Sequence, residues 1–172
     1  MSNLEECIIK AHEDGLVDHI AVRVGKGEQI LNDCFYSADY EINSKTLFDM
    51  ASVTKIMVTT MLTLIAADRK LLNFDDKVNR FFPCPNDKSE LTIKHLLTHT
   101  MGYGHRSLCE KGNTYDNIQN YVLSLPCDFP VGTKVDYSCP GFILLGKILE
   151  KVFGDRLDRP FISLIAAPLG ME

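Results

Sequence analysis

The sequence has no run of about 18 uncharged apolar residues, the length needed to cross a bilayer, so no membrane span is expected. It also lacks an excess of basic residues. Its 172 residues carry a net charge of −5, which argues against nucleic-acid binding, because phosphate recognition needs clustered Lys and Arg. No C-x-x-C pair, the usual mark of a zinc site, is present. Residues 1–6 are acidic and contain no apolar signal core, so we expect a cytoplasmic protein.

What the chain does contain is an ordinary globular composition, 45% hydrophobic and 24% charged. This is enough to bury a sizeable core, and we expect residues 1–172 to form a single domain. Reduced thiols are expected in a protein without a signal peptide, with disulfides as the alternative. The six scattered cysteines are Cys7, Cys34, Cys84, Cys109, Cys127 and Cys139.

The segment 48–55 contains Ser52 and Lys55, and the apolar run after it predicts a buried helix over residues 53–67. One helical turn places both side chains on the same side of that helix. A serine hydroxyl is a poor nucleophile until a base takes its proton, and burial or a helix N-terminus would lower the pKa of a lysine toward that role. The alternative is structural, with a serine at the helix start and a lysine extending to solvent. For so short a motif the spacing alone favours the structural alternative.

Hydrophobic periodicity predicts the other elements of the chain. The first part should form an amphipathic helix followed by an antiparallel hairpin, at residues 3–14, 19–24 and 29–36. The later part should be helical, with segments at 91–100, 115–125, 141–153 and 161–167.

Two pairs of side chains have spacings that also occur at functional sites. His95 and His99 stand four residues apart, as two ligands of one metal would, but no third ligand is evident and structural roles are favoured. Asp75 and Asp76 could form a carboxylate pair, but a helix cap and a first-turn acid are the favoured interpretation. No metal site is therefore predicted.

Several motifs occur in an order that is more specific than a Ser-x-x-Lys spacing alone, in segments 48–55, 72–78, 91–102, 132–154 and 168–171. Together they resemble the serine β-lactamase and penicillin-binding-protein family, and most closely its class C β-lactamase-related serine hydrolases and esterases. The resemblance covers about residues 20–172. It implies a mixed α/β (α+β) fold of the β-lactamase/transpeptidase type. Residues 1–47 would supply a helix and hairpin, and residues 48–172 a largely helical subdomain.

The resemblance also implies chemistry without a metal or organic cofactor. Ser52 would attack the carbonyl carbon of an ester, amide, D-amino-acid peptide or β-lactam and form an acyl-enzyme. Lys55 would take the serine proton or hold it in place, and Tyr137 would share acid and base work. The backbone N–H of Ser52 would be one oxyanion donor. For Tyr137 the alternative is a buried tyrosine that bonds a backbone carbonyl.

Two residues depart from the family pattern, and one of its motifs is absent from the 172 residues. Cys139 occupies a substrate-binding position where the family has Asn, and a thiol forms only weak hydrogen bonds, so β-lactam hydrolysis is in doubt. Met101 replaces a Ser, which we interpret as a packing detail. The family's third motif, Lys-Thr-Gly or His-Thr-Gly, does not occur in the 172 residues.

We therefore expect the chain to be the front part of a longer protein, with little or no hydrolase activity of its own. One alternative is a non-catalytic domain that binds acyl ligands or a partner protein. Another is a helical fragment that folds only with a complementing chain. The sequence leaves the substrate and the oligomeric state open.

Overall fold

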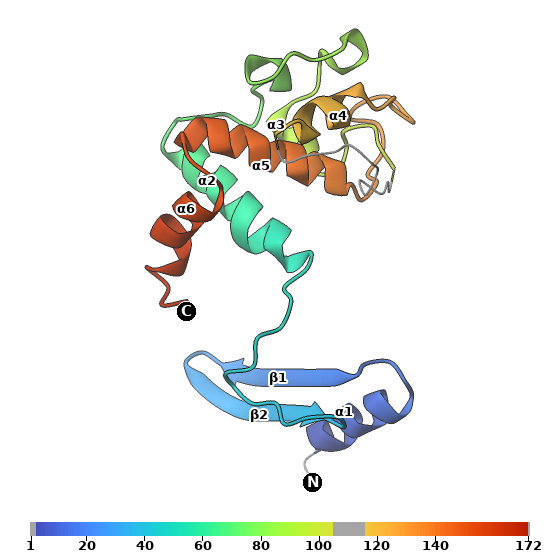
Figure 1. Ribbon diagram of the computed structural model, residues 1–172, viewed down its shortest axis with the longest axis vertical. Coiled ribbons are helices and arrows are strands. Elements are labelled where there is room, and N and C mark those ends of the chain that lie inside the picture. The colour runs from blue at the N-terminus through green and yellow to red at the C-terminus, as the bar shows by residue number, and fades with distance from the viewer. Residues whose placement is uncertain (1–2, 105–115, 172) are drawn as a thin grey trace. The chain divides into compact units, whose positions relative to one another are not determined.

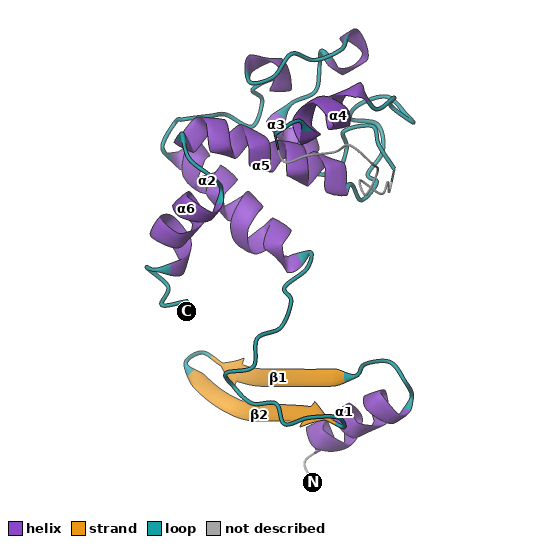
Figure 2. Cartoon of the chain, in the orientation of Figure 1, coloured by secondary structure: helices purple, strands orange, loops and turns teal. Residues whose placement is uncertain are grey.

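The computed structural model describes residues 3–104 and 116–171, and the chain divides into two compact units, Met1–Asp49 and Met50–Glu172 (Figure 1). We call these the hairpin unit and the helical unit. The first holds both strands of the described chain, and the second holds all of its helices except the first (Figure 2). That residues 1–172 form one domain stays a prediction.

The hairpin unit consists of helix α1 (Asn3–Glu13) and strands β1 (His19–Lys26) and β2 (Gln29–Ser37), which confirms the predicted helix and hairpin. The strands pair antiparallel, with His19 opposite Ser37, and a bulge interrupts the register between Val24 and Gly25. Helix α1 packs against β2 and buries Ile8, while Cys34 of β2 is also buried. A small apolar contact between a helix and a two-stranded sheet therefore holds this unit together.

The helical unit is arranged around α5 (Cys139–Phe153), which contacts four other helical segments and crosses the unit in Figure 1. These four are the π-helical segment η1 (Lys55–Thr60), α2 (Met61–Asp68), α3 (Ile93–Leu97) and α4 (Ile118–Ser124). The remaining segments are short: η2 (Val78–Arg80), η3 (Asn86–Lys88), α6 (Asp158–Phe161) and η4 (Ile162–Ala166).

Local signals explain why α5 forms where it was predicted. Ser138 is its N-cap, and the serine Oγ accepts a hydrogen bond from the N–H of Gly141 at 3.3 Å. Pro140 lies in the first turn, where a missing N–H costs nothing. Gly154 ends the helix with a φ of 71°, a left-handed conformation that glycine adopts without strain. The apolar face between these signals buries Leu144, Leu145, Ile148 and Leu149 in the core.

Two predicted helices differ from the observed ones. The helix predicted over 53–67 forms as η1 followed by α2, but it is not buried on all sides, because Ile56 is 67% and Leu64 44% exposed. Its main contacts with another helix are with α5, which covers one face. The helix predicted over 91–100 ends at Leu97, because His99 takes a left-handed φ of 55° that no α-helix accommodates.

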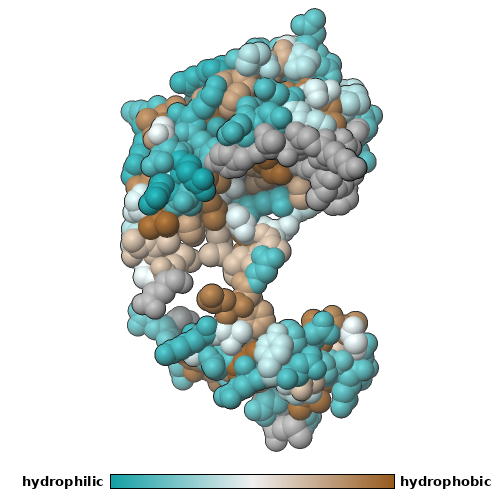
Figure 3. Space-filling view, in the orientation of Figure 1, coloured by the Kyte–Doolittle hydropathy of each residue, from teal (hydrophilic) through white to brown (hydrophobic). Residues whose placement is uncertain are grey.

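Apolar side chains also remain on the surface of each unit, where they appear brown in Figure 3. Leu47 of the hairpin unit and Val135 of the helical unit are prominent examples. None of the helices within residues 3–104 and 116–171 is both long and apolar enough to span a membrane.

Candidate active site

Ser52 lies in a helical turn that leads directly into η1. The backbone carbonyl of Ser52 accepts a hydrogen bond from the N–H of Lys55 at 3.1 Å, so the backbone already forms a turn at the serine. The residue before it, Ala51, has a φ of 40°, which is unusual for a residue with a Cβ. Backbone strain of this kind, held by the surrounding structure, is common at functional sites. The serine side chain remains exposed to solvent.

Two donors converge on the hydroxyl oxygen of Ser52. Lys55 Nζ donates to Ser52 Oγ at 3.1 Å, across one turn of the helix. Tyr137 Oη donates to the same oxygen at 2.7 Å, although it lies 85 residues away in the sequence. The ammonium of Lys55 also lies 5.0 Å from the centre of the Tyr137 ring. The three side chains named from the sequence therefore meet at one oxygen, within the helical unit.

The structure gives Lys55 a different electrostatic role from the one expected. Burial lowers its pKa, but hydrogen bonding to Tyr137 and the negative charge available on Cys139 and Tyr137 raise it, and the net pKa lies above the ordinary value. The expectation that burial or a helix N-terminus would lower the pKa of Lys55 is thus wrong, because the shift is in the opposite direction. Lys55 is a cation at neutral pH and acts here as a donor.

Tyr137 shows the complementary shift. Hydrogen bonding to Lys55 and then to Ser52 lowers the pKa of the Tyr137 phenol below its ordinary value. The side chain is 43% exposed and its hydroxyl donates to Ser52, so the alternative of a buried tyrosine bonded to a backbone carbonyl is wrong. A lowered phenol pKa beside a cation is the environment that a general base requires near neutral pH.

Residues that follow α3 pack against the segment that carries Tyr137 and form hydrogen bonds with it. His99 packs its ring on Tyr137, with ring centres 4.7 Å apart, and its Nδ1 accepts the N–H of Ser138 at 3.0 Å. Met101 is buried and its Sδ accepts a 3.4 Å hydrogen bond from Ser138 Oγ. A Cβ on Gly141 would meet that same Sδ at 2.9 Å, so a larger residue at position 141 would require the methionine side chain to shift.

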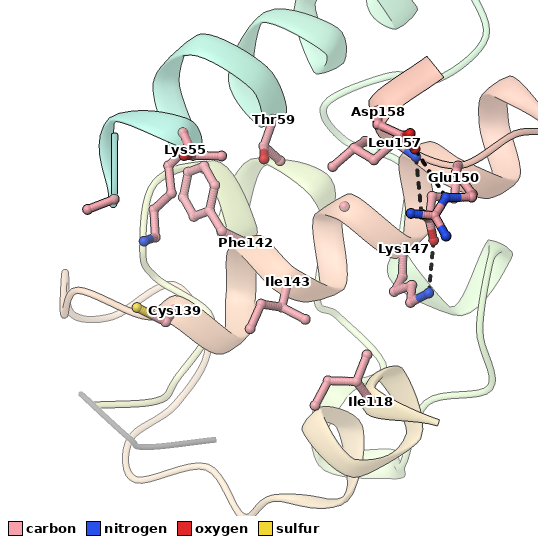
Figure 4. Close-up of a pocket in the computed structure, with 14 residues that line it drawn as sticks. Lys55, Thr59, Ile118, Cys139, Phe142, Ile143, Lys147, Glu150, Leu157 and Asp158 are labelled. Carbon is pink, nitrogen blue, oxygen red and sulfur yellow. Dashed lines mark hydrogen bonds and ion pairs between the residues drawn. The ribbon is translucent and has the colours of Figure 1, made fainter. Parts of the chain in front are cut away.

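A cavity of about 520 Å³ opens beside this site, within the helical unit (Figure 4). Lys55 and Cys139 lie at one end of it, and the Lys147–Glu150 ion pair, 2.9 Å long, at the other. Its walls between the two ends are mainly apolar and come from η1, α4, α5 and the turn before α6. They include Thr59, Ile118, Phe142, Ile143, Gly146 and Leu157. Helical periodicity did not indicate these wall residues, because a cavity wall and a packed core have the same spacing.

Cys139 is the first residue of α5, partly buried, and it lines the cavity near Lys55. It is a free thiol, as are Cys7, Cys34, Cys84 and Cys127; Cys109 lies outside the described residues. The structure brings Cys139 to the same end of the cavity as Lys55, which agrees with a position that contacts substrate.

Asp76 and His95, from the two residue pairs whose spacing also occurs at functional sites, have structural roles. Asp76 accepts the backbone N–H of Asn73 at 2.8 Å and pairs with Arg80, so its carboxylate organises a turn. His95 completes a capping box with Thr92, whose N–H it accepts at 3.2 Å. Within the described part of the chain, no three His, Cys, Asp or Glu side chains form a group that could hold a metal ion.

Comparison with known proteins agrees with this geometry. The sequence profile of the Beta-lactamase family matches residues 9–172, nearly the whole chain. The chain belongs to the beta-lactamase family. Among curated relatives of this beta-lactamase-family chain, Esterase EstB of Burkholderia gladioli is 34% identical over an alignment of 187 positions, which covers 93% of this chain and 47% of the esterase. A Beta-lactamase of Lysobacter lactamgenus is 25% identical, with 76% of this chain and 34% of the relative covered.

Solved structures confirm the β-lactamase/transpeptidase-like fold. A class C beta lactamase from Rhodobacter sphaeroides superposes with a TM-score of 0.81 at 23% identity, covering 97% of this chain and 48% of that one. The chain therefore spans between about a third and a half of the length of these proteins. Its relatives include an esterase, a putative D-alanyl-D-alanine carboxypeptidase and a beta-lactamase, which supports a hydrolase in general terms.

Proposed function

We propose that this chain carries the nucleophile half of a serine hydrolase that forms an acyl-enzyme at Ser52. The observation that carries the proposal is the convergence of Tyr137 Oη, at 2.7 Å, and Lys55 Nζ, at 3.1 Å, on Ser52 Oγ. A nucleophile in contact with a base that a third group orients is the arrangement that covalent catalysis needs. The family relationship supports the same reaction class.

In the proposed mechanism Tyr137 is the base and Lys55 the fixed cation. Once Tyr137 has lost its proton, its oxygen accepts the proton of Ser52 Oγ while Oγ bonds to the substrate carbonyl carbon. The new Tyr137 hydroxyl then donates that proton to the leaving oxygen as the carbon–oxygen bond breaks, which leaves the acyl-enzyme. In deacylation, water gives a proton to Tyr137 as its oxygen bonds to the acyl carbon, and Tyr137 then donates that proton to Ser52 Oγ as the carbon–Oγ bond breaks and the acid is released. Lys55 stabilises the phenolate throughout, consistent with its raised pKa.

The N–H of Ser52 supports the role of an oxyanion donor. No backbone hydrogen bond among the described residues uses it, and it lies at the start of a helical segment, where N–H groups have no intrahelical partner. A second donor would come from the strand that carries Lys-Thr-Gly or His-Thr-Gly in the family, and neither motif occurs in the 172 residues. We therefore expect acylation to be measurable more readily than turnover.

We infer that the substrates are carboxylic esters with an apolar acyl group rather than β-lactams. The cavity beside Ser52 has mainly apolar walls, which suit an alkyl or aryl chain. Cys139 provides no amide with which to bind the amide side chain of a penicillin. The relation to Esterase EstB supports an ester, and D-amino-acid peptides and amides are the competing substrates.

Labelling with a fluorescent fluorophosphonate tests the nucleophile. The wild-type chain should be labelled, Ser52→Ala should not, and the matched variant Ser163→Ala should label as the wild type does, because Ser163 is exposed and bonds only the carbonyl of Pro160. Circular dichroism shows whether each variant is folded. A folded wild type that is never labelled would favour the non-catalytic binding domain instead.

The first-turnover release of p-nitrophenol from acetate and hexanoate esters, set against acylation by a fluorescent penicillin, tests the substrate class. We expect the esters to acylate faster, and the hexanoate faster than the acetate. Cys139→Asn restores an amide at the cavity and should raise penicillin acylation relative to ester acylation. Faster acylation by penicillin in the wild type would contradict the ester assignment.

A further inference from the structure

His99 contacts three successive residues of the segment that carries Tyr137. Its backbone carbonyl accepts the N–H of Asp136 at 2.9 Å. Its ring lies against the Tyr137 ring, with the ring planes inclined by 35°. Its Nδ1 accepts the N–H of Ser138 at 3.0 Å. His99 therefore holds the backbone on both sides of Tyr137 and contacts its ring, so it fixes the position and orientation of the side chain that reaches Ser52.

The conformation of His99 shows that the surrounding structure holds it in place. Its φ of 55° is left-handed, a conformation that costs energy for a side chain with a Cβ. Its ring also packs on Phe142, with ring centres 4.9 Å apart, so it joins the tyrosine to helix α5. A surface histidine would need neither the strained backbone nor the two ring contacts.

The bond to Ser138 defines the protonation state in which His99 does this. A ring nitrogen that accepts an N–H carries no hydrogen, so the neutral ring must be protonated at Nε2. The cationic ring has hydrogens on both nitrogens and would direct an N–H at the N–H of Ser138. It would also place a second positive charge near Lys55, which contacts the same tyrosine.

We propose that His99 is a positioning residue of the acylation site, which holds Tyr137 on Ser52 only while its Nδ1 is unprotonated. The inference rests on the proposed function, because Tyr137 is what it positions. Protonation would break the Ser138 contact and loosen the tyrosine, so the reactivity of Ser52 should fall on acidification even though Ser52 and Lys55 themselves do not titrate there.

The charges around His99 agree with a neutral ring at pH 7. Burial lowers the pKa of His99, and the positive charge of Lys55 lowers it further. The other titratable neighbours are Tyr137, whose proton is lost at higher pH, and Asp136, whose carboxylate is 2.7 Å from Lys134 Nζ.

Two substitutions of His99 test its hydrogen-bond acceptor and its ring contacts separately. His99→Asn places an amide oxygen where Nδ1 stood and suits a left-handed backbone, so it keeps the Ser138 bond and removes the titration. His99→Phe keeps the ring contacts and removes the acceptor. We expect His99→Phe to slow fluorophosphonate labelling about tenfold at pH 7, the factor for one lost hydrogen bond, and His99→Asn to slow it less. The reverse order would overturn the proposal.

The pH profile supplies a readout that a purely structural role would not change. Because deprotonated Tyr137 is the base, labelling of both the wild type and His99→Asn should fall gradually on acidification. The wild type should show an additional fall below about pH 6.5, the ordinary pKa of histidine, which His99→Asn should lack. His95→Gln is the matched control, because glutamine preserves a capping box and removes the neighbouring histidine. If the additional fall in labelling persists in His99→Asn and disappears in His95→Gln, it comes from His95 and the inference is overturned.

Nitrogen NMR of the histidine rings tests the inference without any chemistry at Ser52. At pH 7 the wild type should show His99 with a bare Nδ1 and a protonated Nε2, and the Ser138 amide proton should shift as the ring titrates. A hydrogen on Nδ1 at pH 7 would overturn the inference even if Ser52 is labelled. If Ser52 is never labelled, the proposed function fails, while this spectrum still decides whether His99 holds Ser138 as an acceptor. The spectrum also decides the matter if His99→Phe does not fold.

Discussion

The hairpin unit and the helical unit are stabilised to very different degrees. In the hairpin unit the buried apolar residues are Ile8, Cys34 and Ile42, and the two strands have no further strand beside them among the described residues. All of the largest fully buried side chains belong to the helical unit, where all of them except Lys88 form one continuous core around α5. Two-stranded sheets are marginally stable by themselves, so the hairpin unit should open far more often than the helical unit.

This difference in stability matters because the candidate site lies within the helical unit. Ser52, Lys55 and Tyr137 all belong to the helical unit. The lysine and serine are set by the first turns of η1, and the tyrosine by the N-cap of α5, so the same core that stabilises the unit also fixes their distances. Chemistry and stability should therefore respond to changes in the helical unit and be insensitive to matched changes in the hairpin unit.

The largest effect is expected from Tyr137→Phe, which removes the oxygen that contacts Ser52. Labelling of Ser52 should fall by about 10²–10⁴-fold, the usual contribution of a general base. The free energy of unfolding should change little, because the Tyr137 side chain is 43% exposed and the phenylalanine ring keeps its packing. Tyr40→Phe removes the same atom from an exposed tyrosine of the hairpin unit and should leave labelling unchanged. Equal losses in the two variants would show that the site extends into the hairpin unit.

A core substitution should give the next largest effect, this time on stability. Leu145→Ala truncates a fully buried side chain of α5 and should lower the free energy of unfolding by about 2–5 kcal/mol. Leu31→Ala makes the same change at a β2 residue that is 54% exposed and should cost less than about 0.5 kcal/mol. Urea unfolding followed by circular dichroism at 222 nm measures both. A larger cost at Leu31 would mean that the hairpin unit has a core beyond the described contacts.

The sequence predicted those parts of the helical unit that local signals determine. The helix predicted over 141–153 corresponds to α5, which Pro140 and Gly154 delimit through their own backbone preferences. Ser52 and Lys55 meet because three residues make nearly one helical turn. In both cases the interacting groups are close in the chain, so a short stretch of sequence is enough to predict how they are placed.

The remainder depends on contacts between distant segments. Nothing local places Tyr137 on Ser52, 85 residues away, and only the family resemblance indicated it. The pKa of Lys55 was expected to fall with burial, but the contacts with Tyr137 and Cys139 raise it. His99 was assigned to a helix that ends two residues before it, and its left-handed backbone follows from tertiary contacts that periodicity does not encode.

A buried hydroxyl of the helical unit should give a smaller effect. Tyr103 is fully buried and its hydroxyl donates to the carbonyls of Val122 at 2.8 Å and Leu125 at 3.1 Å, which fastens α4 to the segment after α3. Tyr103→Phe leaves both acceptors without this donor and should lower the free energy of unfolding by about 1–3 kcal/mol. Tyr40→Phe again serves as the control, and an equal change in the two variants would show that the buried hydrogen bonds contribute nothing measurable.

Acidification from pH 7 to pH 5 should give the smallest effect, confined to the helical unit. Burial is the main cause that lowers the pKa of both His95 and His99, so between their folded and unfolded pKa values the unfolded chain binds more protons than the folded one. Stability is then fully present above about pH 6.5 and is lost as the pH falls through the folded pKa values. Asp87 and Asp158, whose pKa values are lowered from 3.8, lose their contribution only at still lower pH. Urea midpoints at pH 7, 6 and 5 should therefore decline for the wild type and much less for the double variant His95→Gln, His99→Asn; an equal decline in both would place the titrating groups elsewhere.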